Sequence, residues 1–203
     1  MRRLVCWDMD ETLGSFGGRK PELAKGIRTV LQKLREAGYC HAITTISPAD
    51  VAERRMNDAG LISHFEGIFG LKDVLAAGKG KSYATAACAM GITNPSDQMI
   101  IIGNDPMDSP VDVDSVFILH PNAMQCSAEV FFTLISWLGA HGSWKAGFSQ
   151  MQSMASETLL VPDFVGGILA VDGISVAMGD MLLKGRVVPN VLLVNQVPEK
   201  YEK

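Results

Sequence analysis

The sequence lacks the features that mark zinc, disulfide-rich and membrane proteins. Its four cysteines and four histidines are scattered over 203 residues, without a Cys-x-x-Cys pair. This spacing argues against zinc, and buried reduced thiols are the better interpretation of the cysteines. No apolar run approaches the roughly 20 residues of a membrane-spanning helix. The apolar stretch at the N-terminus is too short to be typical of a signal peptide, so we expect a cytoplasmic protein.

Positive charge is also scarce. Lysine and arginine number 18 against 22 acidic residues, which gives a net charge of −4 and indicates neither nucleic acid nor an anionic membrane as a partner. The pairs Arg2-Arg3 and Arg54-Arg55 are isolated, and we expect them to be solvated ends of elements. What remains is an ordinary globular composition, 47% hydrophobic and 20% charged, in a chain long enough for one domain with a sizeable appendage.

Strand-like and helix-like patterns alternate along roughly the first 120 residues. Apolar or β-branched runs predict strands, and apolar residues at helical spacing predict helices, with Ser47 as the expected cap of the second helix. This alternation predicts an α/β fold with a parallel sheet and right-handed crossovers. The predicted strands are 3–8, 39–47, 65–70, 97–105 and 115–121, and the predicted helices are 20–38, 47–60 and 81–91.

The pattern changes after about residue 122. Residues 127–142 predict one more helix, and two apolar runs around Asp172-Gly173 predict a β-hairpin over 166–180. Residues 185–195 predict a further strand, with Pro189 confined to its end or to a sheet edge. We therefore expect a core at residues 1–122 and an extension at 123–203, made of a helix and antiparallel β-structure packed on the core.

Acidic residues follow the first predicted strand. Asp8 and Asp10 leave the strand end on a common side, because side chains two apart in an extended chain point the same way. Another buried strand ends in Asn104 and Asp105, followed by Asp108. The carboxyl ends of strands in open α/β sheets form ligand crevices, and oxygen-rich strand ends are typical of a Mg²⁺ site.

The sequence Asp8-x-Asp10-x-Thr after an apolar strand resembles motif I of the haloacid dehalogenase superfamily, most of whose members are Mg²⁺-dependent phosphatases. Three further motifs follow in order over about residues 1–120. Thr45, beside Thr44, matches the second motif, and Lys79 or Lys81 matches the third. The resemblance favours Lys79. It implies a Rossmann-like three-layer α/β/α core.

The resemblance also implies a role for each residue. Asp8 attacks phosphorus to form an aspartyl-phosphate, and Asp10 is the general acid and base. Thr45 and Lys79 hold the transferring oxygens, with Thr44 and Lys81 as additional candidates for binding substrate. The fourth motif, "GNDPMD", has Asn104 where an aspartate is usual. The resemblance leaves open which oxygens of the fourth motif bind Mg²⁺, so the candidate ligands are Asp8, Asp10, Asn104, Asp105 and Asp108.

The sequence leaves alternatives open for the function, the substrate and the role of the extension. The asparagine at position 104 also suits a phosphate-binding or regulatory module with little turnover. The intervals between Asp10, Thr45 and Lys79 are too short for a large cap domain. By resemblance, a capless site admits large phosphorylated substrates, including phosphoproteins or nucleic-acid ends. We expect either that the extension or a second subunit partly covers the site, or that the extension completes the core or a homodimer interface.

Overall fold

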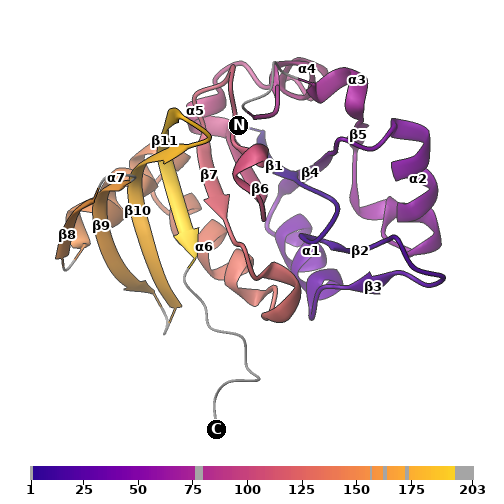
Figure 1. Ribbon diagram of the computed structural model, residues 1–203, viewed down its shortest axis with the longest axis horizontal. Helices are drawn as coiled ribbons and strands as arrows, with labels where there is room; N and C mark the ends of the chain where they lie inside the picture. Colours follow the sequence, from indigo (N-terminus) through magenta and orange to yellow (C-terminus); the bar gives the residue numbers. More distant parts are fainter. Residues whose placement is uncertain (1, 76–79, 156, 162–163, 172–173, 195–203) are drawn as a thin grey trace, which may run out of the picture.

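One large sheet organises the chain (Figure 1). The computed structural model describes residues 2–75, 80–155, 157–161, 164–171 and 174–194. Two further short strands, β2 (Gly14–Ser15) and β3 (Glu22–Leu23), pair with each other. The large sheet has nine strands in the order β5 (Gly67–Phe69), β4 (Tyr39–Thr44), β1 (Arg3–Trp7), β6 (Met99–Gly103), β7 (Val116–Leu119), β11 (Arg186–Val194), β10 (Ile174–Leu183), β9 (Phe164–Val171) and β8 (Glu157–Val161).

Helices connect these strands. Within the described residues, none of the helices combines the length and the apolar character needed to cross a bilayer. The α-helices are α1 (Ile27–Glu36), α2 (Ala49–Asp58), α3 (Leu71–Val74), α4 (Ala84–Ala89), α5 (Pro95–Gln98), α6 (Glu129–Gly139) and α7 (Trp144–Met154). The 3₁₀ helices are η1 (Ile62–His64), η2 (Pro106–Asp108) and η3 (Ala123–Gln125).

The central strands are buried on both faces. In β1, Val5 and Trp7 point into one apolar cluster, and Leu4 and Cys6 point into the other. Helices α1, α2, α6 and α7 contribute to the first cluster, and α3 and α4 contribute to the second. Apolar residues on both sides of a strand require cover on both sides of the sheet. The predicted α/β class with a parallel sheet and two helical layers is confirmed.

The C-terminal strands continue the same sheet. Strand β11 pairs in parallel with β7, placing Val191 opposite Phe117, whereas β8, β9, β10 and β11 pair with one another antiparallel. The predicted helix over 127–142 is present as α6. Helix α7 was not predicted from the sequence, although Ser143 caps it by accepting a hydrogen bond from the Ala146 N–H. The boundary at residue 122 stays a prediction.

Three predicted helix starts are too early, the third because α4 begins at Ala84 and not at residue 81. The first helix begins at Ile27, not at residue 20, because Glu22 and Leu23 pair with β2 and Gly26 takes a left-handed conformation, φ 82°. The second helix begins after Pro48, and Ser47 does not cap it. The Ser47 hydroxyl accepts a hydrogen bond from Arg55.

Both strands of the predicted hairpin are present, as β9 and β10. Ile174 of β10 lies opposite Val171 of β9, and Asp172-Gly173 lies outside the described residues. We expected Pro189 at a strand end or a sheet edge. This is wrong, because Pro189 lies inside β11, which runs between β7 and β10. Pairing of β11 with β7 begins only at Val191, and the register with β10 shifts at Gly179. The proline, which has no N–H to donate, therefore falls where the ladders are interrupted.

Candidate active site

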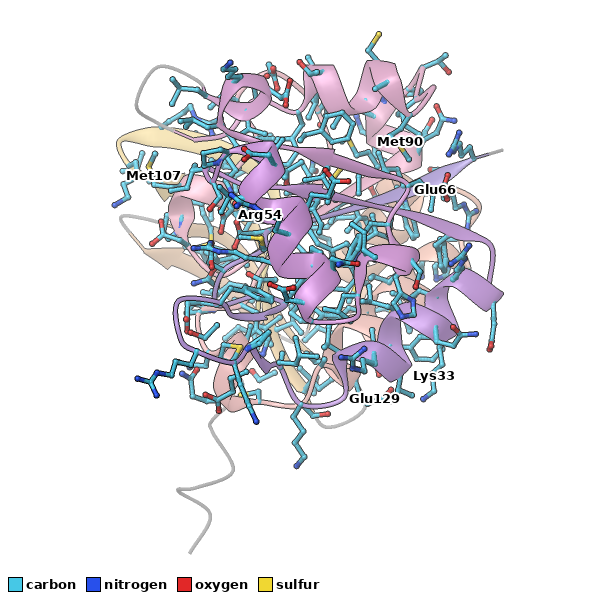
Figure 2. The ribbon with its side chains drawn as sticks, turned by 90° about the vertical axis from the view of Figure 1, so that its right-hand side faces the viewer. Lys33, Arg54, Glu66, Met90, Met107 and Glu129 are labelled. Atoms are coloured by element: carbon cyan, nitrogen blue, oxygen red, sulfur yellow. The ribbon has the colours of Figure 1, made fainter. Side chains whose placement is uncertain are left out.

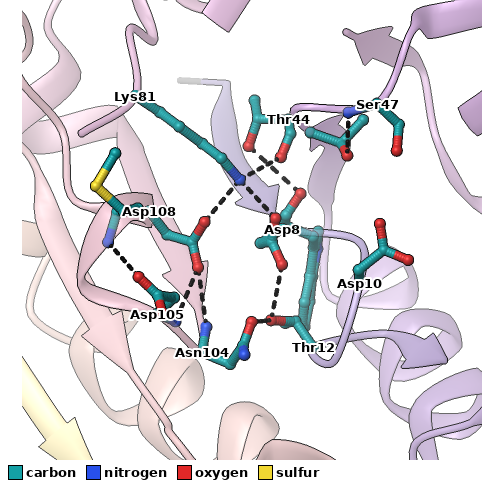
Figure 3. Close-up of polar contacts among 12 residues, drawn as sticks. Asp8, Asp10, Thr12, Thr44, Ser47, Lys81, Asn104, Asp105 and Asp108 are labelled. Atoms are coloured by element: carbon teal, nitrogen blue, oxygen red, sulfur yellow. Dashed lines mark hydrogen bonds and ion pairs between the residues drawn. The ribbon is translucent and has the colours of Figure 1, made fainter. Parts of the chain in front are cut away.

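Predicted site residues from separate parts of the chain meet at the carboxyl ends of β1 and β6 (Figure 3). Asp8 directly follows β1, and its backbone N–H donates to the Ile102 carbonyl of β6 at 2.8 Å. Asn104 directly follows β6, so parallel pairing brings the two side chains together. A cavity of about 370 Å³ opens here, lined by Asp8, Asp10, Thr45, Ile46, Lys81, Asn104, Asp105, Met107 and Asp108.

Lys81 lies between two buried carboxylates. Its Nζ is 2.5 Å from Asp8 Oδ1 and 2.6 Å from Asp108 Oδ1, and all three side chains are at most 10% exposed. The ammonium also donates to the Thr44 carbonyl at 3.1 Å. These contacts match the three N–H donors of a lysine. Two buried carboxyl groups thus share one cation, so the site carries an excess of negative charge when both are ionised.

This arrangement shifts the pKa values of Asp8 and Lys81. Burial raises the pKa of the Asp8 carboxyl, repulsion from Asp108 raises it further, and Lys81 opposes both effects. For Lys81, burial lowers the pKa, but attraction to Asp8 and Asp108 outweighs burial and holds the pKa above its usual value. Lys81 therefore stays protonated and partly offsets the charge of the two aspartates.

Oxygen atoms converge on the other side of Asp8. The Thr12 hydroxyl donates to Asp8 Oδ2 at 3.2 Å. The side-chain amide of Asn104 turns one atom toward this group, 3.1 Å from Thr12 Oγ1 and 3.3 Å from Asp8 Oδ2. The same atom lies 3.1 Å from the Asp10 carbonyl oxygen. If this atom is the amide nitrogen, it donates to these oxygens. If it is the amide oxygen, a cation bound between these oxygens would offset their repulsion.

This donor set fits magnesium. Mg²⁺ prefers carboxylate, carbonyl and water oxygens and completes an octahedron with several waters. Asp8 Oδ2, the Asp10 carbonyl oxygen and the Asn104 amide oxygen supply three such ligands on one side. Within the described part of the chain, no three carboxylate, imidazole or thiol groups form a metal cluster, so the fit depends on the amide and the backbone carbonyl.

The other two candidate metal ligands make different contacts. Asp108 Oδ2 accepts hydrogen bonds from the backbone N–H groups of Asn104 and Asp105, at 3.1 and 3.0 Å. Asp105 caps η2 by accepting from the Met107 N–H at 2.8 Å. Asp108 thus shapes the loop and holds Lys81, and the Asp105 carboxylate is occupied at the start of η2.

Asp10 stands apart from the Asp8–Lys81–Asp108 network, on the side where Ser47 lies (Figure 3). Its side chain is 43% exposed, and its Oδ2 is 3.5 Å from Nη1 of Arg55. Burial raises the pKa of Asp10, while Arg55 opposes the rise. Sequence reasoning missed Arg55, because the pair Arg54-Arg55 was interpreted as solvated. Only Arg54 is largely solvated, and it pairs with Asp50. The available signal for Arg55 was its position on the helix predicted over 47–60.

The remaining candidates differ in position. Thr45 is buried, lines the cavity and accepts a hydrogen bond from the Ser47 N–H at 3.1 Å. Thr44 turns its hydroxyl to the Trp7 carbonyl, so it contributes only its own carbonyl to the site. Lys79 lies outside the described residues. Of the two candidate lysines, the structure places Lys81 against Asp8.

The chain was compared with curated proteins, solved structures and family models. No protein with a curated description matches the sequence. Among solved structures, an uncharacterised protein from Listeria monocytogenes serotype 4b is 19% identical with a TM-score of 0.46, over 60% of this chain and 80% of that chain. A haloacid dehalogenase-like family hydrolase from Xanthomonas campestris is 14% identical with a TM-score of 0.46, over 60% and 83%. One from Streptococcus pneumoniae is 13% identical with a TM-score of 0.45, over 64% and 90%.

A family model gives the assignment. The model described as haloacid dehalogenase-like hydrolase matches residues 5–113, which is more than half of the chain. This range contains the Asp8 loop, Thr45, Lys81 and the Asn104–Asp108 loop. The chain belongs to the haloacid dehalogenase-like hydrolase family.

Proposed function

We propose that the protein hydrolyses phosphomonoesters, with Asp8 as the nucleophile and Mg²⁺ as the cofactor. The observation that carries the proposal is that the two carboxylate oxygens of Asp8 have different neighbours. Oδ1 lies 2.5 Å from Lys81, whereas Oδ2 faces Thr12 and Asn104. These surroundings support a proposal in which Oδ2 binds the metal and Oδ1 attacks the phosphoryl group.

In the proposed reaction, Asp8 Oδ1 attacks phosphorus and forms an aspartyl-phosphate while the ester P–O bond breaks. Asp10 gives a proton to the leaving oxygen. Water then attacks the phosphorus of the aspartyl-phosphate, Asp10 takes a proton from that water, and the Asp8–phosphorus bond breaks to release phosphate. The exposed position of Asp10 at the mouth suits a group that meets first the leaving group and then water.

Lys81 and Thr45 would stabilise the transferring oxygens. The ammonium of Lys81 sits beside the attacking oxygen, and Thr45 already accepts a hydrogen bond from the Ser47 N–H, so its own hydrogen can be given to a phosphoryl oxygen. This assigns the lysine role to Lys81 in place of Lys79.

Asp8 Oδ2, the Asp10 carbonyl oxygen and the Asn104 amide oxygen would hold Mg²⁺. The bound ion supplies positive charge that lets the anionic carboxylate and the anionic ester approach each other. We leave Asp105 and Asp108 out of this ligand set, because their carboxylates already serve η2, the loop and Lys81.

Among the described residues, none beyond Asp108 lines the cavity. Between Asp10 and Thr45 the chain forms only the hairpin β2–β3, helix α1 and strand β4, without a separate cap. We propose that the substrate is a phosphorylated molecule that can be large. A phosphate-binding or regulatory module with little turnover is the second candidate, favoured by the neutral amide at Asn104.

Activity against p-nitrophenyl phosphate separates the two candidates. We expect hydrolysis that requires Mg²⁺, is abolished by a chelator, and falls about 10³-fold or more in Asp8→Asn. Asp180→Asn, an exposed aspartate of β10, is the matched control and keeps wild-type rates. Phosphate binding without Mg²⁺-dependent turnover would instead support the module, and full activity in Asp8→Asn would contradict both the nucleophile and the mechanism.

A further inference from the structure

Arg55 is a cation that contacts the cavity residue Asp10 and keeps unused donors. Lys81, the only cation among the described residues lining the cavity, directs its three N–H groups to Asp8, Asp108 and Thr44. A guanidinium has five N–H donors in a planar fork. Within the described part of the chain, Arg55 makes side-chain contacts through Nη1 alone, to Asp10 at 3.5 Å and Ser47 at 3.3 Å.

Arg55 lies on the side of the site that the leaving group would occupy. Asp10 is the residue that protonates the leaving oxygen, and Arg55 contacts the Asp10 carboxylate from α2. Lys81 lies on the opposite side, beside the attacking oxygen of Asp8. A group held by Arg55 therefore belongs to the part of the substrate beyond the ester oxygen and not to the transferring phosphoryl group.

The contacts that hold Arg55 are loose. Its side chain is 32% exposed, and a single 3.5 Å contact to a half-exposed carboxylate is a weak ion pair. A carboxylate or phosphate can form two parallel, shorter bonds with the same fork. An anionic group on the substrate can thus engage the guanidinium without leaving a buried charge unpaired.

We infer that Arg55 is a specificity-determining residue that binds a second anionic group on the leaving part of the substrate, a few atoms from the ester oxygen. The inference rests on the proposed phosphomonoesterase function and names the substrate class for the same site. The substrate is then a phosphate ester whose alcohol carries a carboxylate or a further phosphate. Ile46, 65% exposed at the lining of the cavity, offers an apolar surface beside that anion.

Two phosphate esters of primary alcohols test this inference. 3-Phosphoglycerate carries a carboxylate where glycerol 3-phosphate carries a hydroxymethyl group, and the two leaving alcohols are alike. The measured quantity is the ratio of kcat/KM for 3-phosphoglycerate to kcat/KM for glycerol 3-phosphate, with Mg²⁺ present. Damage to the general acid Asp10 lowers both values together and leaves their ratio unchanged.

The variants are Arg55→Gln, Arg55→Lys and Arg54→Gln. Arg54 is the matched control: it is the preceding residue of α2, its side chain is 72% exposed (Figure 2), and its ion pair is with Asp50. We expect Arg55→Gln to lower the ratio by about tenfold or more, because a charge-assisted hydrogen bond is lost. Arg55→Lys lowers it less, and Arg54→Gln leaves it at the wild-type value.

The outcomes distinguish the inference from the proposed function. An unchanged ratio in Arg55→Gln, or an equal fall in Arg54→Gln, overturns the role of Arg55 while the phosphatase function stands. A wild-type ratio no higher than that of Arg55→Gln also overturns it. If the wild-type protein hydrolyses neither these esters nor p-nitrophenyl phosphate, the proposed function fails and the inference fails with it. Thermal melting of each variant checks whether its fold is intact.

Discussion

At the scale of single residues, the site is defined by a shortage of positive charge. Asp8 and Asp108 are buried, and Lys81 is the cation that both contact. Buried charges are tolerated only when they are paired and hydrogen-bonded, and this group holds two anions for one cation. The proposed divalent ion beside Asp8 Oδ2 would reverse that imbalance, so we expect phosphate binding to depend on metal binding.

Substitution of the two candidate lysines tests which of them serves the reaction. We expect Lys81→Met to lower kcat/KM by about 10²-fold or more, because the charge beside the attacking oxygen is lost. Lys79→Met is the control, with a loss of less than about tenfold. Rates are measured with p-nitrophenyl phosphate and Mg²⁺. A larger loss in Lys79→Met than in Lys81→Met would reverse the assignment.

At the scale of elements, the C-terminal half of the molecule depends on close packing between helices α6 and α7. Helices α6 and α7 contact each other where Gly147 of α7 meets Leu138 of α6. A Cβ atom at Gly147 would lie 2.3 Å from the Leu138 carbonyl oxygen, which is a steric clash with backbone. Glycine within a helix normally lowers stability relative to alanine, so here the close approach has outweighed helix propensity.

Gly147→Ala is therefore expected to destabilise the protein. We predict a loss of about 2 kcal/mol in the free energy of unfolding, from overpacking against α6. Gly17→Ala is the control, because nothing lies within 4 Å of a Cβ atom at that position. Both are measured by denaturant unfolding. An increase in stability for Gly147→Ala, as helix propensity alone predicts, would contradict the packing described for α6 and α7.

Local patterns predicted most elements, and non-local contacts account for the differences. The strand that ends at Trp7 and the strand that ends at Gly103 were evident from apolar runs. The hairpin β2–β3 was missed because Glu22 and Leu23 fit a helical pattern, and only their pairing with β2 makes them strand. The parallel pairing of β11 with β7 joins residues more than 70 positions apart, which no local pattern reveals.

The same distinction applies to the site. Asp8, Asp10, Thr45 and Asn104 were predicted because their order along the chain carries the motifs. Contacts of Arg55 with Asp10 depend on how α2 lies across the sheet, so sequence reasoning missed them.

At the scale of the whole molecule, one core spans both parts of the chain. The larger apolar cluster includes Val5 and Trp7 of β1 together with Phe131, Trp144 and Met178 from the C-terminal half. Next to this cluster, His41 of β4 is 1% exposed, and its Nδ1 accepts a hydrogen bond from Trp7 Nε1 at 3.0 Å. The pKa of His41 is lowered to about 4, mainly by burial, with smaller contributions from His64 and Arg35 that the Leu31 backbone and Glu66 oppose.

This buried imidazole makes the stability of the fold depend on pH. The unfolded chain binds a proton at His41 near pH 6.5, whereas the folded chain does so only near pH 4. The unfolded state therefore holds more protons between these values, and stability falls as the pH is lowered through them. We expect His41 alone to account for a loss of about 2 to 3 kcal/mol between pH 7 and pH 4.5.

Denaturant unfolding at both pH values measures this effect. His41→Gln keeps an acceptor for Trp7 and removes the titration, so its stability should fall less than that of the wild type by the same amount. Equal pH dependence in both proteins would show that His41 is not held neutral.

The central claim is that Asp8 uses one oxygen for Mg²⁺ and the other for phosphorus, and a crystal structure with Mg²⁺ and beryllium fluoride tests it most directly. We predict beryllium fluoride bonded to Asp8 Oδ1 beside Lys81. We also predict Mg²⁺ about 2.1 Å from Asp8 Oδ2, the Asp10 carbonyl oxygen and the Asn104 amide oxygen. Beryllium fluoride bound away from Asp8, or Mg²⁺ held without Asp8 and Asn104, would contradict the account.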